Sequence, residues 1–251
     1  MSRILFALVV ITLFVGCGKK GVLISPEALL PAPVNDLRAA QKGESLQLSW
    51  SPPAQEEGGR ALKDLAGFRL FKREVLPPDE DCESCTNAYR LLKNVDLEYL
   101  QDVRRVGDRL YLRDTDVIAQ TTYQYKVVSF RKDGTSSHDS NKARLKMVVP
   151  PKPPRLTALF SVTGVLLHWE GGSSLPNGKI LGCNVYRWRA GALPAVVPLK
   201  DAPVSGHDYE DLRLVRGVTY IYALRAVAEV EGAMVESEFS NEIKGMLTEP
   251  E

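Results

Sequence analysis

The residues of this chain whose spacing best suits chemistry are Cys82 and Cys85, which are separated by two intervening residues. A reactive cysteine pair needs a low thiol pKa, which a helix N-terminus or nearby positive charge supplies. Here Asp79, Glu80, Asp81 and Glu83 surround the pair, and negative charge raises a thiol pKa. A structural disulfide, two free thiols, and redox or metal chemistry remain open. Export to an oxidising compartment would favour the disulfide.

Other catalytic, metal or haem sites find little support. A zinc site needs about four ligands, and neither a second cysteine pair nor a nearby histidine completes one around Cys82. Covalent haem attachment needs a histidine directly after the second cysteine, where Thr86 stands. His138, His168 and His207 are scattered along the chain without a matching nucleophile and orienting group. We therefore expect no enzymatic activity, no metal and no cofactor.

The N-terminus carries an export signal. Residues 4–15 form a mostly apolar run, too short to span a bilayer but suited to a signal peptide. The sequence from Phe14 to Cys17 resembles the lipobox of bacterial lipoproteins, although Phe14 stands where that family usually has Leu, Val or Ile. The resemblance implies cleavage after residue 16 and lipidation of Cys17, with acyl chains such as palmitate attaching the protein stably to a membrane. Gly18, in place of an aspartate, favours the outer membrane by the sorting rules of that family.

Composition is that of an ordinary globular protein. The chain has 251 residues, of which 44% are hydrophobic, and its 32 Lys and Arg nearly balance 31 Asp and Glu. This length allows two cores of about 100 residues each. Without a long basic run, we expect no nucleic-acid partner. Residues 17–30 form the expected lipidated N-terminus and tether. The stretch from Gly18 to Pro33, with Pro26, Pro31 and Pro33 and little periodic pattern, is expected to be semi-extended and to reach up to about 50 Å from the membrane.

One pattern of residues occurs twice. Leu37 leads through an alternating apolar strand to Trp50, and Leu156 leads to Trp169, with thirteen residues from first to last in both. Further landmarks follow in the same order in each half. They are Gly67 to Lys72 and Gly182 to Arg187, Asp114 and Asp211, Tyr123 and Tyr220, Ser140-Asn141 and Ser240-Asn241. Such repetition indicates an internal duplication. We expect the two aspartates to bond nearby backbone in turns rather than to form an acid pair.

Both halves resemble fibronectin type III domains. In that family a tryptophan on the second strand is buried, and a tyrosine corner enters the sixth strand. Trp50 and Trp169 match the first feature, and Tyr123 and Tyr220 match the second, although the first corner lacks the usual glycine. The resemblance implies an all-β fold of two tandem immunoglobulin-like β-sandwiches. They are expected at 31–149 and 155–247, joined by a stiff proline linker at 150–154 into a rod. Cys183 is expected to be a small buried hydrophobic residue.

The first half is longer. Phe68 to Tyr123 spans 55 residues, against 37 from Cys183 to Tyr220. The insertion, near 77–106, is expected to form a loop at 77–87 and a helical turn or two at 97–106. We also expect the 77–87 loop to lean on residues 171–179 and stiffen the junction between the domains.

These features predict a non-enzymatic, lipid-anchored protein of the bacterial cell envelope that acts as an interaction or scaffold module. Its partners would be the membrane, through the N-terminal lipid, and an envelope protein or polysaccharide. The alternatives are an accessory or spacer subunit of an envelope enzyme or assembly machine and, with less support, a redox factor that uses Cys82 and Cys85. Recognition is expected in the loops at 77–87, 131–139 and 229–238, because loops on rigid sandwiches often carry binding sites.

Overall fold

The computed structural model describes residues 25–85, 87–172, 175 and 178–249, so the predicted signal peptide and the predicted lipidation site Cys17 lie outside the described part. Among the described residues, the regular elements are strands apart from one short 3-10 helix, η2 (Pro26–Leu29). The predicted all-β class is confirmed. Within the described residues, no helix has the length and apolar character needed to cross a membrane.

The first domain is a sandwich of two antiparallel sheets. One sheet has the order β1-β2-β6-β5 and the other β4-β3-β7-β8. Alternate residues of β2, namely Leu46, Leu48 and Trp50, are buried between the sheets, because successive side chains of a strand point to opposite faces. The strands are β1 (Arg38–Lys42), β2 (Ser45–Trp50), β3 (Leu65–Glu74), β4 (Arg90–Asp96), β5 (Val103–Val106), β6 (Arg109–Asp114), β7 (Thr122–Arg131) and β8 (Ala143–Lys146).

The second domain repeats this plan. Its first sheet has the order β12-β10-β9, and in its second sheet β13 pairs with β11 on one side and with β14 and β15 on the other. Trp169 of β10 is buried, as Trp50 is in the first domain. The strands are β9 (Arg155–Phe160), β10 (Val165–Glu170), β11 (Gly178–Arg189), β12 (Asp208–Asp211), β13 (Tyr220–Val230), β14 (Ala233–Glu236) and β15 (Ile243–Gly245).

A tyrosine corner closes each domain. The hydroxyl of Tyr123 accepts a hydrogen bond from the backbone N–H of Ile118 (3.0 Å), and that of Tyr220 accepts one from Val215 (3.3 Å). Both bonds reach five residues back along the chain. The corner therefore forms in the first domain without the glycine that Gly217 provides in the second.

The insertion differs from its expected structure. The prediction of helical turns at 97–106 is wrong, because the end of this segment is strand β5, which pairs with β6. Tyr111 and Leu112 extend the ladder opposite Arg104 and Val103, so the extra residues add a fourth strand to the first sheet.

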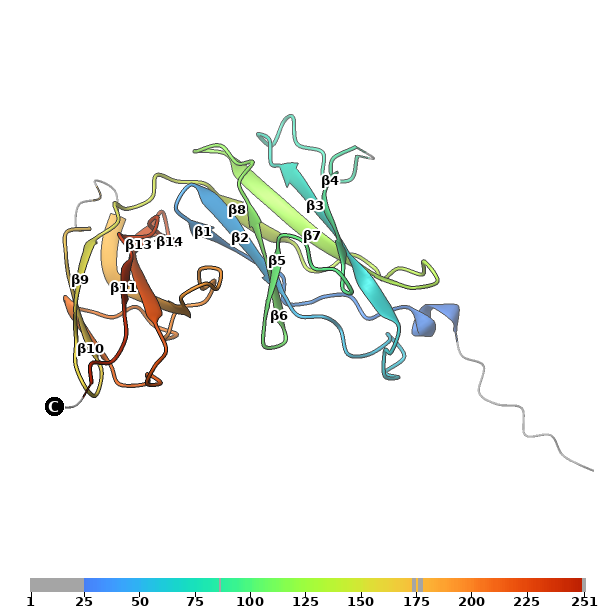
Figure 1. The fold of residues 1–251 in the computed structure, drawn as a ribbon. Coiled ribbons are helices and arrows are strands. Elements are labelled where there is room, and N and C mark those ends of the chain that lie inside the picture. Colours follow the sequence, from blue (N-terminus) through green and yellow to red (C-terminus); the bar gives the residue numbers. More distant parts are fainter. Residues whose placement is uncertain (1–24, 86, 173–174, 176–177, 250–251) are drawn as a thin grey trace, which may run out of the picture.

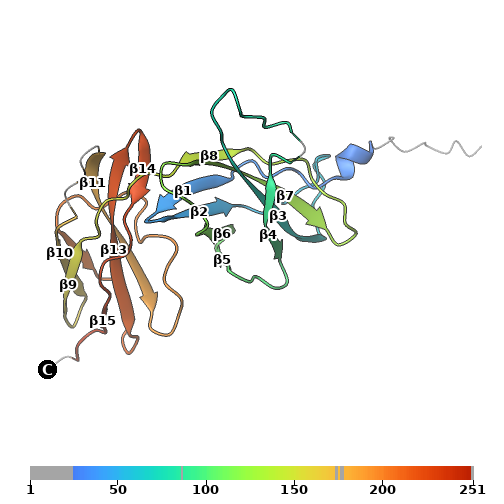
Figure 2. The same ribbon diagram turned by 90° about the horizontal axis from the view of Figure 1, so that it is seen from above.

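The two sandwiches share one continuous sheet. Strand β1 of the first domain pairs in parallel with β14 of the second, opposing Gln41 to Val235 and Lys42 to Glu236. The resulting eight-stranded sheet runs from β11 to β5. The strands of the two domains cross at a large angle, so the molecule is bent at the junction (Figures 1 and 2). Backbone pairing therefore connects the domains in addition to the proline linker.

Candidate interaction site at the domain junction

The junction between the domains includes residues 229–238, a segment predicted from the sequence to be an exposed binding loop. These residues instead hold the end of β13, a tight turn and β14. Val235 and Glu236 are buried, and β14 pairs with β1. The prediction of a free loop is wrong for this part, because the first domain occupies its edge.

A buried carboxylate holds the two domains together. Glu236 accepts hydrogen bonds from Asn184 Nδ2 (2.7 Å) and the Tyr186 hydroxyl (2.6 Å) of its own domain, and it pairs with Lys42 of the first domain. Its side chain is only 9% exposed. Burial and the neighbouring Glu236 raise the pKa of Tyr186, which keeps that hydroxyl protonated as a donor. The guanidinium of Arg225 adds positive charge 3.9 Å away.

Lys42 is desolvated at this site. Burial lowers the pKa of Lys42, while the charge of Glu236 opposes that shift. The Lys42 ammonium also donates to the Tyr186 hydroxyl (3.1 Å). The Lys42–Glu236 ion pair therefore has a specific geometry, but the cost of removing both charges from water offsets much of their attraction.

Further polar contacts extend along the junction. The backbone N–H of Gly43 donates to the Glu236 carbonyl (2.8 Å), and that of Glu44 to the Glu238 carboxylate (3.0 Å). Gly43 has a φ of +62°, a backbone conformation that favours glycine, and a Cβ there would displace the Glu238 carboxylate from its bond with Glu44.

A groove lies beside these contacts. It has a volume of about 460 Å³ and is lined by residues of both domains. Two bonds close one side of the groove, from Gln47 Nε2 to the Val196 carbonyl (3.2 Å) and from Arg104 Nη1 to the Pro194 carbonyl (3.0 Å). The lining includes Leu100, Val103, Tyr111, Tyr186, Leu193 and Phe239, together with the cations Lys42, Arg104, Arg113 and Arg225. The groove is therefore apolar with a basic rim, and its shape depends on how the domains are docked.

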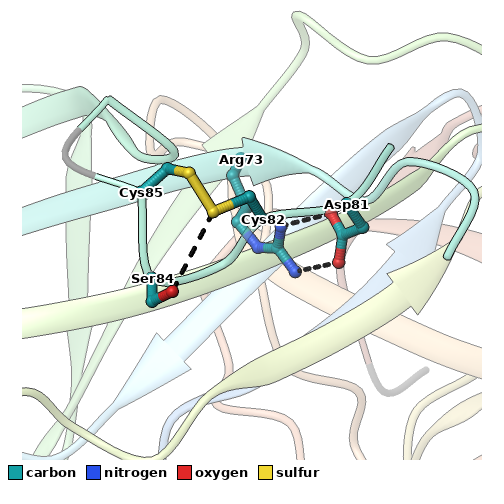
Figure 3. The surroundings of a disulfide bond; sticks show 5 residues. All are labelled: Arg73, Asp81, Cys82, Ser84 and Cys85. Carbon is teal, nitrogen blue, oxygen red and sulfur yellow. Dashed lines mark hydrogen bonds and ion pairs between the residues drawn. A yellow bond between two sulfur atoms is a disulfide. The ribbon is translucent and has the colours of Figure 1, made fainter. Parts of the chain in front are cut away.

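The disulfide loop lies elsewhere. Cys82 and Cys85 are joined by a disulfide, and both residues are exposed (Figure 3). The guanidinium of the buried Arg73 holds both oxygens of Asp81 (2.6 and 3.0 Å), which lowers the pKa of that carboxyl. With Lys142 also bonded to Glu83, this loop packs on strands of its own sheet.

The expected contact between the 77–87 loop and residues 171–179 falls partly outside the described structure, because residues 86, 173–174 and 176–177 are not among the described residues. Every polar contact recorded for Asp81 and Glu83 among the described residues goes to the first domain. The junction is instead held by β1, β14 and the Glu236 carboxylate.

Each domain also contains the same buried ion pair. Asp114 accepts from the Tyr125 hydroxyl (2.8 Å) and pairs with Lys72 (2.8 Å). In the second domain Asp211 accepts from Tyr222 (2.8 Å) and pairs with Arg187 (2.6 Å). Both aspartates also accept a backbone N–H two residues ahead, as expected of turn residues. They lie inside separate domains, so they support folding and form no joint site.

The remaining candidate residues do not assemble a catalytic site. His138 is exposed 3.7 Å from Glu57, His168 pairs with Asp208 (2.7 Å), and His207 contacts the Trp169 carbonyl (3.1 Å). Cys183 is buried, and desolvation raises its pKa to about 11. Within the described residues, no cluster of three or more metal-ligating side chains occurs.

Sequence reasoning missed the junction for an identifiable reason. The only local signal is that Lys42 and Glu236 end two short strands beside tight turns, and such charges usually lie in solvent. Nothing in their spacing indicates that residues 194 apart meet.

Comparisons with known proteins identify no family for this chain. No family model matches the chain, and no curated protein matches it. One solved structure, titled "Crystal structure of chicken CNTN1 FN1-FN3 domains", is 16% identical, with 87% of this chain and 67% of that chain covered and a TM-score of 0.33. The immunoglobulin-like sandwich class rests on the strand order of the two domains themselves.

Proposed function

We propose that this protein is a non-enzymatic, lipid-anchored interaction module of a bacterial cell envelope, attached through Cys17 and located at the outer membrane. The observation that carries the proposal is the parallel pairing of β1 with β14, which fixes two sandwiches around a groove. A flexible pair of domains would lose more conformational entropy when it binds a partner across both, so a preset junction favours binding.

The position of the N-terminus supports an anchored arrangement. Helix η2 docks on the end of the first domain that lies away from the second domain (Figure 1). Backbone bonds from Glu57 to Leu30 and from Gly58 to Ala28 (both 2.9 Å) hold it there. The end of the expected tether is therefore folded rather than extended. From Ser25 back to Cys17, eight residues would reach at most about 29 Å, which keeps the first domain near the lipid and the second domain farther out.

Lipidation is tested by replacing Cys17 with serine. We expect the chain with Cys17, which carries the acyl chains, to sediment with outer membranes. Cys17→Ser should lose that association, because acyl chains supply the membrane affinity. The mass of the mature N-terminus should show an acylated cysteine as the first residue. A mature protein that begins with Met1, or a serine variant that still sediments, would overturn the anchoring proposal.

Interaction is tested by site-specific photo-crosslinking in intact native envelopes. A crosslinking residue at Leu193, on the groove and 65% exposed, is compared with one at Leu159, which is 73% exposed on the second domain's other sheet. We expect a discrete adduct of one protein or polysaccharide at one or more surface positions. If a scan of exposed positions yields no reproducible adduct, the protein acts only as a spacer, and the interaction proposal fails.

A further inference from the structure

The eight-stranded sheet ends in strand β5, which pairs on one side only, with β6. Val106 and Arg109 flank the two-residue turn that joins these strands, and Gly107 there has a φ of +57°. The pair that flanks a two-residue hairpin turn exchanges hydrogen bonds, and the pairs then alternate along the ladder. Consequently the N–H and C=O groups of Val103 and Arg105 point away from the sheet.

This edge is open in the described structure. Among the described residues, no backbone bond outside the strand ladders involves Val103 or Arg105. The strand also has no register shift and no proline, two of the devices by which edge strands avoid pairing. An added strand could therefore pair with β5 over its whole length.

The edge borders the groove between the domains. Val103 and Arg104 of β5 line the groove together with Tyr111, while Leu193 faces them from the second domain. Leu193 is 65% exposed, and Val106, on the same face of β5 as Arg104, is 41% exposed. A strand lying along β5 would present alternate side chains to these apolar residues.

Positive charge prevails along this rim. Arg104 donates to the Pro194 carbonyl, and no ion pair of Arg104 with a carboxylate is found among the described residues. Arg105 is exposed. The acid on this wall, Asp102, is paired with Lys93 (2.9 Å). The charge thus complements acidic side chains on the incoming strand.

We infer that the β5 edge and the adjoining groove bind an extended segment of a partner protein in which acidic residues alternate with apolar ones. This inference rests on the proposed interaction function and adds the surface and the class of partner. The added strand supplies backbone hydrogen bonds to Val103 and Arg105. Its apolar side chains lie on the groove face of β5, beside Arg104 and Val106, and its acidic side chains lie on the opposite face, where Arg105 is exposed.

The test must separate backbone pairing from charge, because charged side chains also protect edges against unwanted pairing. Arg105→Pro removes the outward N–H but leaves the ladder to β6 intact, whereas Arg105→Ala removes the same charge and keeps the N–H. The two variants are thus a matched pair. Thermal unfolding of both establishes that each is folded.

The probe is a phage-displayed library of random nine-residue peptides, selected on the purified full chain in detergent. We expect enrichment of sequences that alternate Asp or Glu with Val, Leu, Ile or aromatic residues. Synthetic versions should bind at least about fivefold more weakly to Arg105→Pro, the loss expected for one hydrogen bond. Binding to Arg105→Ala should change by less than about threefold, because an exposed charge contributes little.

Other results would overturn the inference. Selected peptides that bind Arg105→Pro as well as the unmodified chain, or a library that yields no enriched sequence, would exclude strand addition at β5. A self-associating chain whose dimer disappears in Arg105→Pro would make the occupant a second copy instead of a partner. Crosslinks to a partner at other surfaces would leave the interaction function standing while this site fails.

Discussion

Replacing Lys42 with methionine tests how the two domains are held together. The change removes the first domain's cation from the Glu236 carboxylate and keeps most of the apolar stem. Losing a charge-assisted hydrogen bond costs about 1.5–3 kcal/mol, and stripping a buried charge of its partner costs about 3–5 kcal/mol. Glu236 keeps its bonds from Asn184 and Tyr186, and Lys42 is itself desolvated. We therefore expect about 2 kcal/mol, or roughly a 30-fold weaker docking of the domains.

Urea unfolding followed by tryptophan fluorescence measures this loss, because Trp50 and Trp169 report on separate cores. The unmodified chain should unfold in one transition, and Lys42→Met should separate it into two. Lys132→Met is the matched control, since it breaks the exposed pair with Glu98, where the side chains are 64% and 74% exposed. That control should leave the single unfolding transition and its midpoint unchanged, because an exposed ion pair contributes little to stability. Equal effects of the two variants would refute the assigned role of Lys42.

Three further outcomes are expected. Cys183 should resist alkylation at pH 8 until the chain unfolds, because burial raises its thiol pKa to about 11. The Cys82–Cys85 disulfide should yield two alkylated thiols after mild reduction. Mass spectrometry of the alkylated chain measures both results. A low pKa of the Cys82 or Cys85 thiol after reduction would instead support the redox alternative. Tyr220→Phe should lower stability by about 1 kcal/mol in a urea titration, through loss of the corner hydrogen bond; an unchanged midpoint would contradict that role. The Asp81 carboxyl has a pKa below its usual 3.8, chiefly through its bonds from Arg73, so the loop should stay docked above pH 4 and loosen as pH falls through the lowered pKa. Hydrogen exchange of the loop measures this, and exchange that is independent of pH after correction for the intrinsic rate would count against it.

The repeated part of the fold could be predicted from the sequence. Period-two strands closing on Trp50 and Trp169 indicate half-buried strands, because only one face of each strand packs in the core. The corner tyrosines and the matching aspartates follow from the same duplication. The sequence also shows cations at equivalent positions, Lys72 and Arg187. It does not indicate that each is buried beside an aspartate, because a charged residue on a strand usually faces solvent.

The features unique to one domain could not be predicted in the same way. The segment at 97–106 has no strong period and becomes a strand because β6 offers it an edge. The sequence of residues 229–238 indicates a turn between two strands, and the structure has one there, between β13 and β14. The free edge of β14, however, pairs with β1 of the first domain. Both outcomes depend on which surfaces meet in three dimensions, and local propensity contains no such information.

The central claim is that β1 and β14 fix the two domains as one body around the groove. Double electron–electron resonance tests it directly, by measuring the distance between nitroxide spin labels at Glu98→Cys and Lys244→Cys in a Cys17→Ser background. Because both labelled positions lie on described strands or turns of different domains, one narrow distance distribution is predicted. It should broaden when Lys42→Met is added. A broad distribution in the chain with Lys42 intact would contradict the claim.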